Sequence, residues 1–427
     1  MKIRHLLFVF VILALALSAC VPQAPAPEVP AAEEAAPVEE AAPVEEAAPV
    51  EEAGAPEACA TDAFGCAVIP AGDTIKIGMG APMLGDYGMF GIDISQGVEV
   101  ALTQDDGFEG WSYELIAEDT GGAPEAGAAV ANKMVTDPTV VAIAGHIFSG
   151  STAAAMPIYE KAGLPMMSPS ATLPELTEKG SAVFNRLAFT DATQAKFAAQ
   201  LLFESLGVTK LAVMHDGTSY GQGLADGVAA EFTTLGGEVV ATEAITPGEV
   251  DYIAPLSSVA AKGPQAIYYG GYAAEAIVMA NQWEQAGLAG VTLFGCDGTY
   301  GVEFTDKAGP NAEGSIAVSL VPPDSAEKTA FDEAYSSTYG MKAGELSAFS
   351  WSAYDTGAVL VAAIEKVAVV GADGNLYIPR GALVEAVRNT DTEGLTGLVK
   401  CDEVGECNAS GPTFYIVENG EWVPYIP

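Results

Sequence analysis

Two stretches rich in hydroxyl side chains are candidate anion-binding sites in this chain. The first, Phe148-Ser149-Gly150-Ser151-Thr152, follows an apolar run at 140–147, and the second, Ser168-Pro169-Ser170-Ala171-Thr172, follows Met166-Met167. We expect each stretch to lead from a strand into a helix, where hydroxyls and unpaired amide N–H groups attract a carboxylate. Two consecutive strand ends would bring both stretches to one anion. Ordinary helix capping by Ser149 or Ser151 is the alternative for the first stretch alone.

The composition of the 427 residues excludes several classes of function. Seventeen Lys and Arg against 57 Asp and Glu give a net charge of −40, which argues against binding nucleic acid. The histidines, His5, His146 and His215, are too few for a His-rich metal centre, so no metal or cofactor is expected. Residues 78–83, Gly-Met-Gly-Ala-Pro-Met, lack the third glycine of a dinucleotide-binding loop, which argues against a Rossmann dehydrogenase.

The elements that must position the hydroxyls alternate in type along the chain. Short runs rich in Val and Ile alternate with amphipathic segments, which is typical of an α/β fold with mostly parallel sheets. One parallel sheet seldom holds so many units, so we expect two lobes of similar, Rossmann-like design. Strands are predicted at residues 75–80, 140–147, 210–215, 266–269, 291–294 and 315–321. Helices are predicted at residues 128–135, 151–161, 192–206, 222–234, 273–285 and 327–339.

The end of the chain predicts a hairpin. Asn419-Gly420 is a strong turn dipeptide, and apolar segments at 414–417 and 421–426 flank it. We therefore expect the fold to finish on an antiparallel pair of strands.

The cysteines fit a chain that folds in an oxidising compartment. Cys59 and Cys66 lie seven residues apart before the first predicted strand, and Cys401 and Cys407 lie six apart near the C-terminus. Two local disulfides are the favoured pairing, although four cysteines permit three connectivities. Cys296 is left unpaired and is interpreted as a small buried apolar residue.

The N-terminus has the features of an export signal. Basic Lys2 and Arg4 precede fourteen largely apolar residues, 6–19, which are too few to span a membrane core of about 30 Å. Residues 1–19 are therefore predicted to be a signal peptide. Leu17-Ser18-Ala19-Cys20 resembles the lipobox of bacterial lipoproteins, which predicts lipid on Cys20; a cysteine that merely lies near an ordinary cleavage site is the alternative.

A low-complexity segment follows Cys20. Residues 21–57 contain ten Glu and no Lys or Arg, and Ala-Ala-Pro-Val-Glu-Glu repeats in tandem from Ala35 to Glu52. Regular proline and like charges favour an extended chain over a packed one. We expect residues 20–57 to form a lipid-bearing linker.

Four stretches together resemble a known family. They lie at residues 145–152, 168–176, 215–223 (His-Asp-Gly-Thr-Ser-Tyr-Gly-Gln-Gly) and 268–275 (Tyr-Tyr-Gly-Gly-Tyr-Ala-Ala-Glu). In order and spacing they resemble the type I periplasmic binding proteins of the branched-chain amino acid (Leu/Ile/Val-binding) class, the substrate-binding subunits of ABC importers. The resemblance covers roughly residue 74 to the C-terminus.

This resemblance implies two lobes joined by a three-segment hinge. The chain would cross between the lobes near residues 188–191, 319–323 and 399–403. Lobe 1 would then contain residues 58–190 plus 322–400, and lobe 2 residues 191–321 plus 401–427.

The resemblance also implies how the two ends of an amino acid are held. Ser149, Ser170 and Thr172 on the first lobe would bind the α-carboxylate with nearby backbone amides. Asp297, in Gly295-Cys296-Asp297-Gly298, matches the acidic residue that takes the α-ammonium group. Without the resemblance, Asp297 would be interpreted as a helix cap. A zwitterion removed from water needs donors at one end and a carboxylate at the other, which makes this assignment chemically coherent.

Aromatic residues are implied to surround the ligand's side chain. Tyr220 and Tyr272 match second-lobe residues that face the ligand, although a core position is the alternative for each. Phe90 matches a position where family members place an aromatic residue, and Phe349 aligns with another more loosely. The chain departs from the family at Phe148, which replaces a cysteine that some members use in a disulfide. Asp297 is another departure, because the best-known amino-acid binders have glutamate there.

We therefore expect an extracytoplasmic, membrane-anchored lipoprotein that captures an amino acid with a branched-chain, other apolar or aromatic side chain, or a similar small polar ligand. It would deliver this ligand to the membrane subunits of an ABC permease, as a monomer and not as an enzyme. Binding of an amide or urea, or a role as a ligand sensor, is the alternative on the same fold. A hydrolase with His146 as base and Ser149 as nucleophile is a rival from another class, but no third, orienting residue is identifiable.

Overall fold

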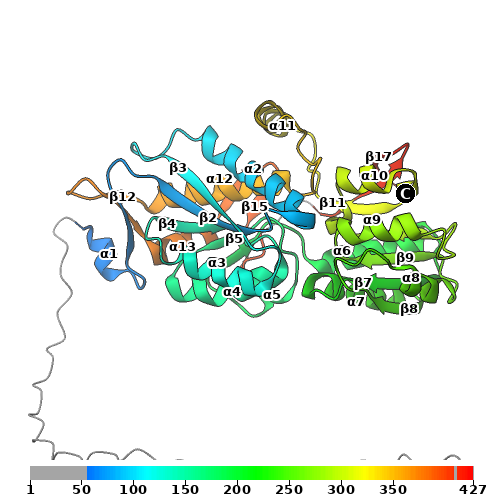
Figure 1. Ribbon diagram of the computed structural model, residues 1–427. Coiled ribbons are helices and arrows are strands. Elements are labelled where there is room, and N and C mark those ends of the chain that lie inside the picture. Colours follow the sequence, from blue (N-terminus) through cyan, green and yellow to red (C-terminus); the bar gives the residue numbers. More distant parts are fainter. Residues whose placement is uncertain (1–54, 408–410, 427) are drawn as a thin grey trace, which may run out of the picture. The chain divides into compact units, whose positions relative to one another are not determined.

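The computed structural model of the chain describes residues 55–407 and 411–426 (Figure 1). The predicted signal peptide, Cys20 and most of the predicted linker lie outside the described residues. Within the described part, the chain has an α/β fold built on two large sheets of mainly parallel strands, which confirms the predicted fold class.

The first large sheet has five strands, all parallel, in the order β3-β2-β4-β5-β6. Apolar residues of β2 and β4 are fully buried, as expected of central parallel strands covered by helices. The strands are β2 (Ile75–Ala81), β3 (Tyr113–Asp119), β4 (Val140–Ala144), β5 (Met166–Ser168) and β6 (Phe184–Arg186). The helices between them are α2 (Gly88–Gln104), α3 (Pro124–Met134), α4 (Ser149–Ala162) and α5 (Glu175–Glu178).

The second large sheet has seven strands in the order β17-β16-β11-β10-β9-β7-β8. Its five central and edge strands from β7 to β11 are parallel, and β16 and β17 add an antiparallel pair. The strands are β7 (Lys210–His215), β8 (Glu238–Ala244), β9 (Ala266–Gly270), β10 (Thr292–Phe294), β11 (Ile316–Ser319), β16 (Thr413–Glu418) and β17 (Glu421–Pro424). The helices are α6 (Asp191–Gln200), α7 (Ser219–Thr234), α8 (Ile253–Ala260), α9 (Ala273–Gln282) and α10 (Val302–Ala308).

The first lobe is discontinuous in sequence. Helices α11 (Ala326–Tyr339), α12 (Ser350–Val367) and α13 (Arg380–Arg388) follow the last parallel strand of the second sheet. In the structure α12 nevertheless packs on α2 and on β4 and β5, so the chain returns to the first sheet before it ends in the second (Figure 1). A polar link reinforces this return, because the buried Asp93 of α2 accepts hydrogen bonds from Tyr335, Ser347 and Ser350.

Small elements close the margins of the first lobe. Strand β13 (Leu376–Pro379) pairs with β1 (Cys66–Ile69) and β12 (Val369–Val370), and β14 (Asp391–Gly394) forms a hairpin with β15 (Gly397–Lys400). Disulfides join Cys59 to Cys66 and Cys401 to Cys407. Short helix α1 (Glu57–Thr61) precedes Asp62, whose carboxylate accepts the amides of Gly381 and Ala382 at the start of α13.

Several predicted elements end earlier than the sequence pattern indicates, and two of them end where the backbone geometry changes. The strand predicted at 140–147 stops at Ala144, because Gly145 has a φ of 146° that leaves the strand geometry. The helix predicted at 192–206 is α-helical only to Gln200 and continues as a π-helical turn over Leu201–Ser205. Both differences depend on backbone geometry that apolar periodicity does not encode.

Candidate functional site

The two hydroxyl-rich stretches lie side by side at the C-terminal ends of β4 and β5. Ser170 donates a hydrogen bond to the carbonyl of Ile147, and Ser168 donates one to the carbonyl of His146, at 2.8 and 2.7 Å. In the other direction, the amide of Leu173 donates to the hydroxyl of Ser149 at 3.3 Å. These bonds hold the two loops together as one surface, as predicted for neighbouring parallel strands.

Helix α4 points its N-terminus into this surface. It begins at Ser149, and no side chain of its N-cap residue, Phe148, bonds the first amides. A helix N-terminus carries a partial positive charge and unpaired N–H groups, so it favours a carboxylate. The first-lobe side of the site therefore attracts an anion without a basic side chain.

The opposite side of the site comes from the second lobe and is acidic. Asp297 follows β10, is buried, and accepts hydrogen bonds on Oδ1 from Tyr220 and Gln194, both at 2.6 Å. Both side-chain bonds fall on Oδ1, and the carboxylate lines the cavity described below. Burial raises the pKa of Asp297 above its usual range, although these two hydrogen bonds favour the charged form.

A second buried acid, Asp191, stands beside Asp297 and was not predicted as a site residue. It opens α6, and neither of its carboxylate oxygens makes a hydrogen bond of regular geometry among the described residues, although the hydroxyl of Thr172 lies near enough to favour its charged form. Burial, and after it the charge of Asp297, raises the pKa of Asp191 well above its usual range. In sequence Asp191 reads as an ordinary acidic residue in the first turn of a helix, so only its neighbours in space reveal it.

Aromatic rings close the space between the hydroxyl surface and the acids. Phe148 and Tyr272 stack with centroids 4.5 Å apart, and Phe90 contacts both rings edge-on. Tyr87 also contacts Tyr272 and Phe148, and its hydroxyl donates to Glu275 at 3.1 Å. The resulting wall combines rings from both lobes.

The enclosed cavity is small and joins all of these elements. It measures about 10 Å³, close to the space that one water molecule needs. Its lining residues are Phe90, Ile94, Ile147, Phe148, Ser149, Ser170, Tyr220, Tyr272, Asp297, Gly298 and Phe349. A second cavity of about 300 Å³ shares Phe148, Tyr220 and Tyr272 with it, so separating the stacked pair would join the two spaces.

The structure brings together most of the predicted site residues. Six of them line the cavity, namely Phe90, Ser149, Ser170, Tyr220, Tyr272 and Asp297, and the loosely aligned Phe349 lines it too. Thr172 is buried but is not among the lining residues, and its backbone carbonyl accepts the amide of Asp191. Phe148, Asp191 and Gln194 complete the surroundings and were not predicted to contact a ligand.

The arrangement around His146 does not resemble a catalytic pair. Its Nε2 bonds the hydroxyl of Tyr159 at 2.9 Å, whereas Ser149 interacts with the amide of Leu173. Burial lowers the pKa of His146 to about 4, so the ring is neutral near pH 7. The hydrolase alternative requires a hydrogen bond between this histidine and Ser149, and the described residues form none.

The free cysteine of the described region lies directly behind the acid. Cys296 is fully buried. Its thiol lies within hydrogen-bond distance of the Tyr220 hydroxyl and donates to the carbonyl of Gly271. Burial raises the pKa of its thiol to about 12, so it is an unreactive packing residue.

Comparison with known proteins places this site in a family. Residues 74–414 match the sequence profile of the periplasmic binding proteins. The chain belongs to the periplasmic binding protein family. Membership implies a location outside the cytoplasm. Within residues 55–407 and 411–426, no helix is both long and apolar enough to cross a bilayer.

The most similar relatives include proteins named for amino-acid binding. The leucine-, isoleucine-, valine-, threonine-, and alanine-binding protein of Pseudomonas aeruginosa is 31% identical over 349 residues, which cover 81% of this periplasmic binding protein and 90% of that one. A leucine-binding protein from Thermotoga maritima superposes with a TM-score of 0.75 at 28% identity, covering 83% of this chain and 98% of that one. A branched-chain amino acid transporter substrate-binding protein from Streptococcus pneumoniae, solved with isoleucine, superposes with a TM-score of 0.71 at 28% identity. The superposition covers 83% of this chain and 100% of that one.

Proposed function

We propose that this periplasmic binding protein captures an amino acid with an apolar side chain between its two lobes and delivers it to an ABC permease. The observation that carries the proposal is the pairing of a helix N-terminus with hydroxyls on one wall and Asp297 on the other, around one cavity. Relatives named for binding leucine, isoleucine and valine support the same ligand class.

The charges around the cavity favour a zwitterion over a simple anion. The lining contains Asp297 and no Lys or Arg, and the buried Asp191 interacts electrostatically with that acid. A ligand with only a carboxylate would meet this negative charge without relief. An ammonium group beside the carboxylate of Asp297 compensates it.

The aromatic wall favours an apolar side chain on the ligand. A free amino acid is far larger than the 10 Å³ enclosed by the lining, so binding requires the pair Phe148–Tyr272 to separate. Separation would connect the cavity to the adjoining 300 Å³ space, whose walls include the rings of Tyr87, Phe148, Tyr220 and Tyr272. A branched or aromatic ligand side chain would then replace the ring-to-ring contacts with contacts to itself.

The proposal is tested with L-leucine and two matched analogues in calorimetry on the purified full chain. Isopentylamine lacks the carboxylate and 4-methylpentanoate lacks the ammonium group, while both keep the alkyl chain. We expect leucine to bind and each analogue to bind at least 100-fold more weakly. Equal binding of leucine and 4-methylpentanoate would overturn the role of Asp297.

A thermal-shift panel of the twenty amino acids, amides and urea addresses the alternative ligands. A ligand at 100 times its Kd raises stability by about 2.7 kcal/mol, which a melting curve detects. A response to amides or urea without any to amino acids would favour the alternative ligand class. Chemical turnover of any bound compound, lost in Ser149→Ala, would instead support a hydrolase.

We infer further that Cys20 carries the lipid anchor and that residues 20–57 form the linker to the folded part. The lipobox-like stretch 17–20 and the repeated Ala-Ala-Pro-Val-Glu-Glu support this inference. Wild type should partition into the membrane fraction of a bacterial host, and Cys20→Ala should not. Size-exclusion chromatography with light scattering tests the expected monomer, and limited proteolysis tests the lobe boundaries 58–190 plus 322–400 and 191–321 plus 401–427.

A further inference from the structure

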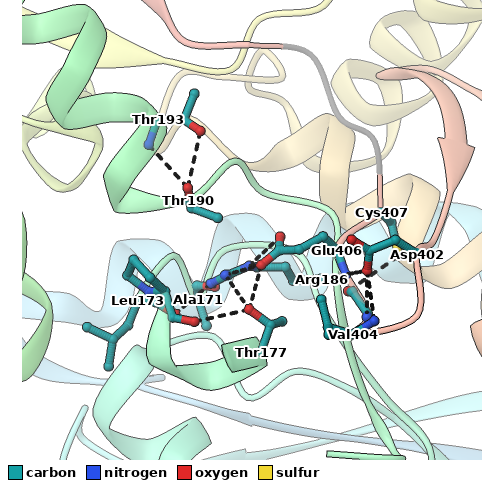
Figure 2. A network of polar contacts seen from close by, with 12 residues as sticks. Ala171, Leu173, Thr177, Arg186, Thr190, Thr193, Asp402, Val404, Glu406 and Cys407 are labelled. Carbon is teal, nitrogen blue, oxygen red and sulfur yellow. Dashed lines mark hydrogen bonds and ion pairs between the residues drawn. The ribbon is translucent and has the colours of Figure 1, made fainter. Parts of the chain in front are cut away.

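Arg186 is a buried cation behind the carboxylate-facing loop that the proposed function does not use. It ends β6, and its side chain has no solvent exposure. Its Nη1 donates to the backbone carbonyls of Ala171 and Leu173, at 3.2 and 2.7 Å (Figure 2). Charged donors make stronger hydrogen bonds than neutral ones, so this guanidinium fixes the backbone on both sides of Thr172.

The held segment is the one that faces the ligand cavity. Ser170 lines the cavity, and the amides of Ala171 and Leu173 donate to the hydroxyls of Ser168 and Ser149. Moving the carbonyls of Ala171 and Leu173 would therefore move the hydroxyls that we assign to the ligand's carboxylate.

Arg186 is held in turn by a loop from the far end of the sequence. Both oxygens of Glu406 accept from its guanidinium, with Nε at 3.1 and 2.9 Å, and Thr177 bridges the two side chains (Figure 2). The backbone of Arg186 also pairs with Gly405 and Cys407. Desolvated charges need such complete pairing, because a lone buried guanidinium is costly.

The loop that carries Glu406 is itself closed on both ends. The Cys401–Cys407 disulfide joins its ends, and Asp402 accepts the amides of Val404, Gly405 and Glu406 at 2.9 to 3.0 Å. This loop lies between β15 of the first lobe and β16 of the second sheet. Arg186 is the last residue of β6, directly before the segment that leads to α6, so its bonds to Glu406 join two of the segments that connect the lobes.

We propose that Arg186 is a positioning residue for ligand binding, and that the loop closed by Cys401 and Cys407 sets its position through Glu406. The identity of the ligand in this inference rests on the proposed function. The placement of residues 170–173 by Arg186 does not. It makes the disulfide a determinant of the binding surface as well as of stability.

The test compares Arg186→Met with Arg388→Met in the full chain. Arg388 is a matched control, because it bonds the same strand through Asn185 and the carbonyl of Phe184 and the same loop through the carbonyl of Glu403. It does not bond residues 170–173. Amide exchange of the ligand-free protein and calorimetry with L-leucine are the two measurements.

We expect Arg186→Met to accelerate exchange of the amides of Ala171 and Leu173 at least tenfold and to raise the Kd for L-leucine at least tenfold. Arg388→Met should change these exchange rates and the Kd less than twofold, even if it lowers the melting temperature as much as Arg186→Met does. Glu406→Gln keeps the side-chain shape and should give an intermediate effect, which covers the case in which Arg186→Met does not fold. Unchanged exchange at these two amides in Arg186→Met or Glu406→Gln would overturn the proposal.

The disulfide is tested by a matched pair of double variants. Cys401→Ser with Cys407→Ser should raise both the local exchange rate and the Kd, and Cys59→Ser with Cys66→Ser should leave both unchanged. Equal effects of the two pairs would contradict a specific role for the loop. A further outcome is that wild type fails to bind L-leucine while the variants still change the exchange of the amides of Ala171 and Leu173 as expected. In that case the proposed ligand is wrong, and the positioning of residues 170–173 by Arg186 is supported.

Discussion

Phe148 and Tyr272 stack face to face, with ring centroids 4.5 Å apart and planes 8° apart, although 124 residues separate them and they come from different sheets. Each is the residue immediately before a helix, Phe148 before α4 and Tyr272 before α9. Both therefore occupy the position from which parallel α/β units present ligand contacts. The stack is a direct contact between the lobes at the ligand cavity.

This stack predicts a pair of coupled binding residues. Phe148→Ala and Tyr272→Ala should each raise the Kd for L-leucine about tenfold, since each removes an aromatic surface that the ligand's side chain would contact. The double variant should lose less than the sum of the single losses, because each ring packs on the other. Calorimetry measures all three.

Phe203→Ala is the control for that experiment. Phe203 forms an edge-on aromatic pair with Phe232 in the second lobe and does not line the cavity. It should lower stability and leave the Kd unchanged. A weakening of binding as large as that in Phe148→Ala would show that the effect is general destabilisation.

The buried acids predict opposite effects on stability and on binding. The folded protein raises the pKa of Asp191, so the free energy of unfolding falls as the pH rises above the pKa of an unfolded Asp, and the full loss is reached above the raised value. Asp191→Asn should therefore raise the melting temperature of the ligand-free protein at pH 7.5. It should also raise the Kd for L-leucine, by about 10- to 100-fold, because the ligand's ammonium loses a charged neighbour.

Melting curves and calorimetry at pH 5.5 and 7.5 check this prediction. Affinity of the wild type for L-leucine should fall as the pH falls, since protonation of Asp191 and Asp297 removes the negative charge that faces the ammonium group. Asp191→Asn should show a smaller pH dependence. A lower melting temperature in Asp191→Asn than in wild type at pH 7.5 would contradict the assignment.

Asp93 predicts a second, ligand-independent pH effect. Burial raises its pKa to about 6, although hydrogen bonds from Ser347, Ser350 and Tyr335 favour the charged form. The pKa of an unfolded Asp is near 4, so the free energy of unfolding should fall as the pH rises from about 4 to 6, by up to about 3 kcal/mol. Urea unfolding of wild type and Asp93→Asn across this range tests it, and identical pH profiles of the two proteins would refute it.

Asp62 predicts a stability effect at the margin of the first lobe. Its carboxylate accepts the amides of Gly381 and Ala382, at 3.0 and 3.1 Å, and so caps α13 from more than 300 residues away. Asp62→Ala should lower the free energy of unfolding by about 1 kcal/mol, as the loss of a capping side chain does. Asp86→Ala, at an exposed position, is the control and should change stability by less than about 0.5 kcal/mol in denaturant unfolding.

Local pattern was sufficient for much of the fold. The strand predicted at 210–215 coincides with β7, and the Asn419-Gly420 turn joins β16 to β17 as an antiparallel pair. The order of the hydroxyl-rich stretches after β4 and β5 was readable for the same reason, because strand period and turn chemistry are local properties. The family resemblance then supplied Asp297, Tyr220 and Tyr272, which pattern alone would have interpreted as cap and core.

The site residues that the sequence analysis did not predict are those whose role depends on residues distant in the sequence. In the sequence, Asp191 is an ordinary acidic residue at the start of a helix, and Gln194 is one of many polar helix residues. Only the fold shows that Asp191 interacts with Asp297 and that Gln194 donates a hydrogen bond to it. Phe90 was expected in the site, yet the helix that carries it, α2, was not predicted and is packed by α12 from much later in the chain.

By itself, then, the sequence predicted an export signal, and it determined the alternation of strands and helices and the residue types that could bind a zwitterion, since each of these follows from composition or from short-range spacing. Tertiary structure alone decided which acid lines the cavity, which rings meet across the lobes, and how Glu406 reaches Arg186. Those relationships join segments that only folding brings within hydrogen-bond distance, where burial makes an unpaired charge costly and a paired one specific.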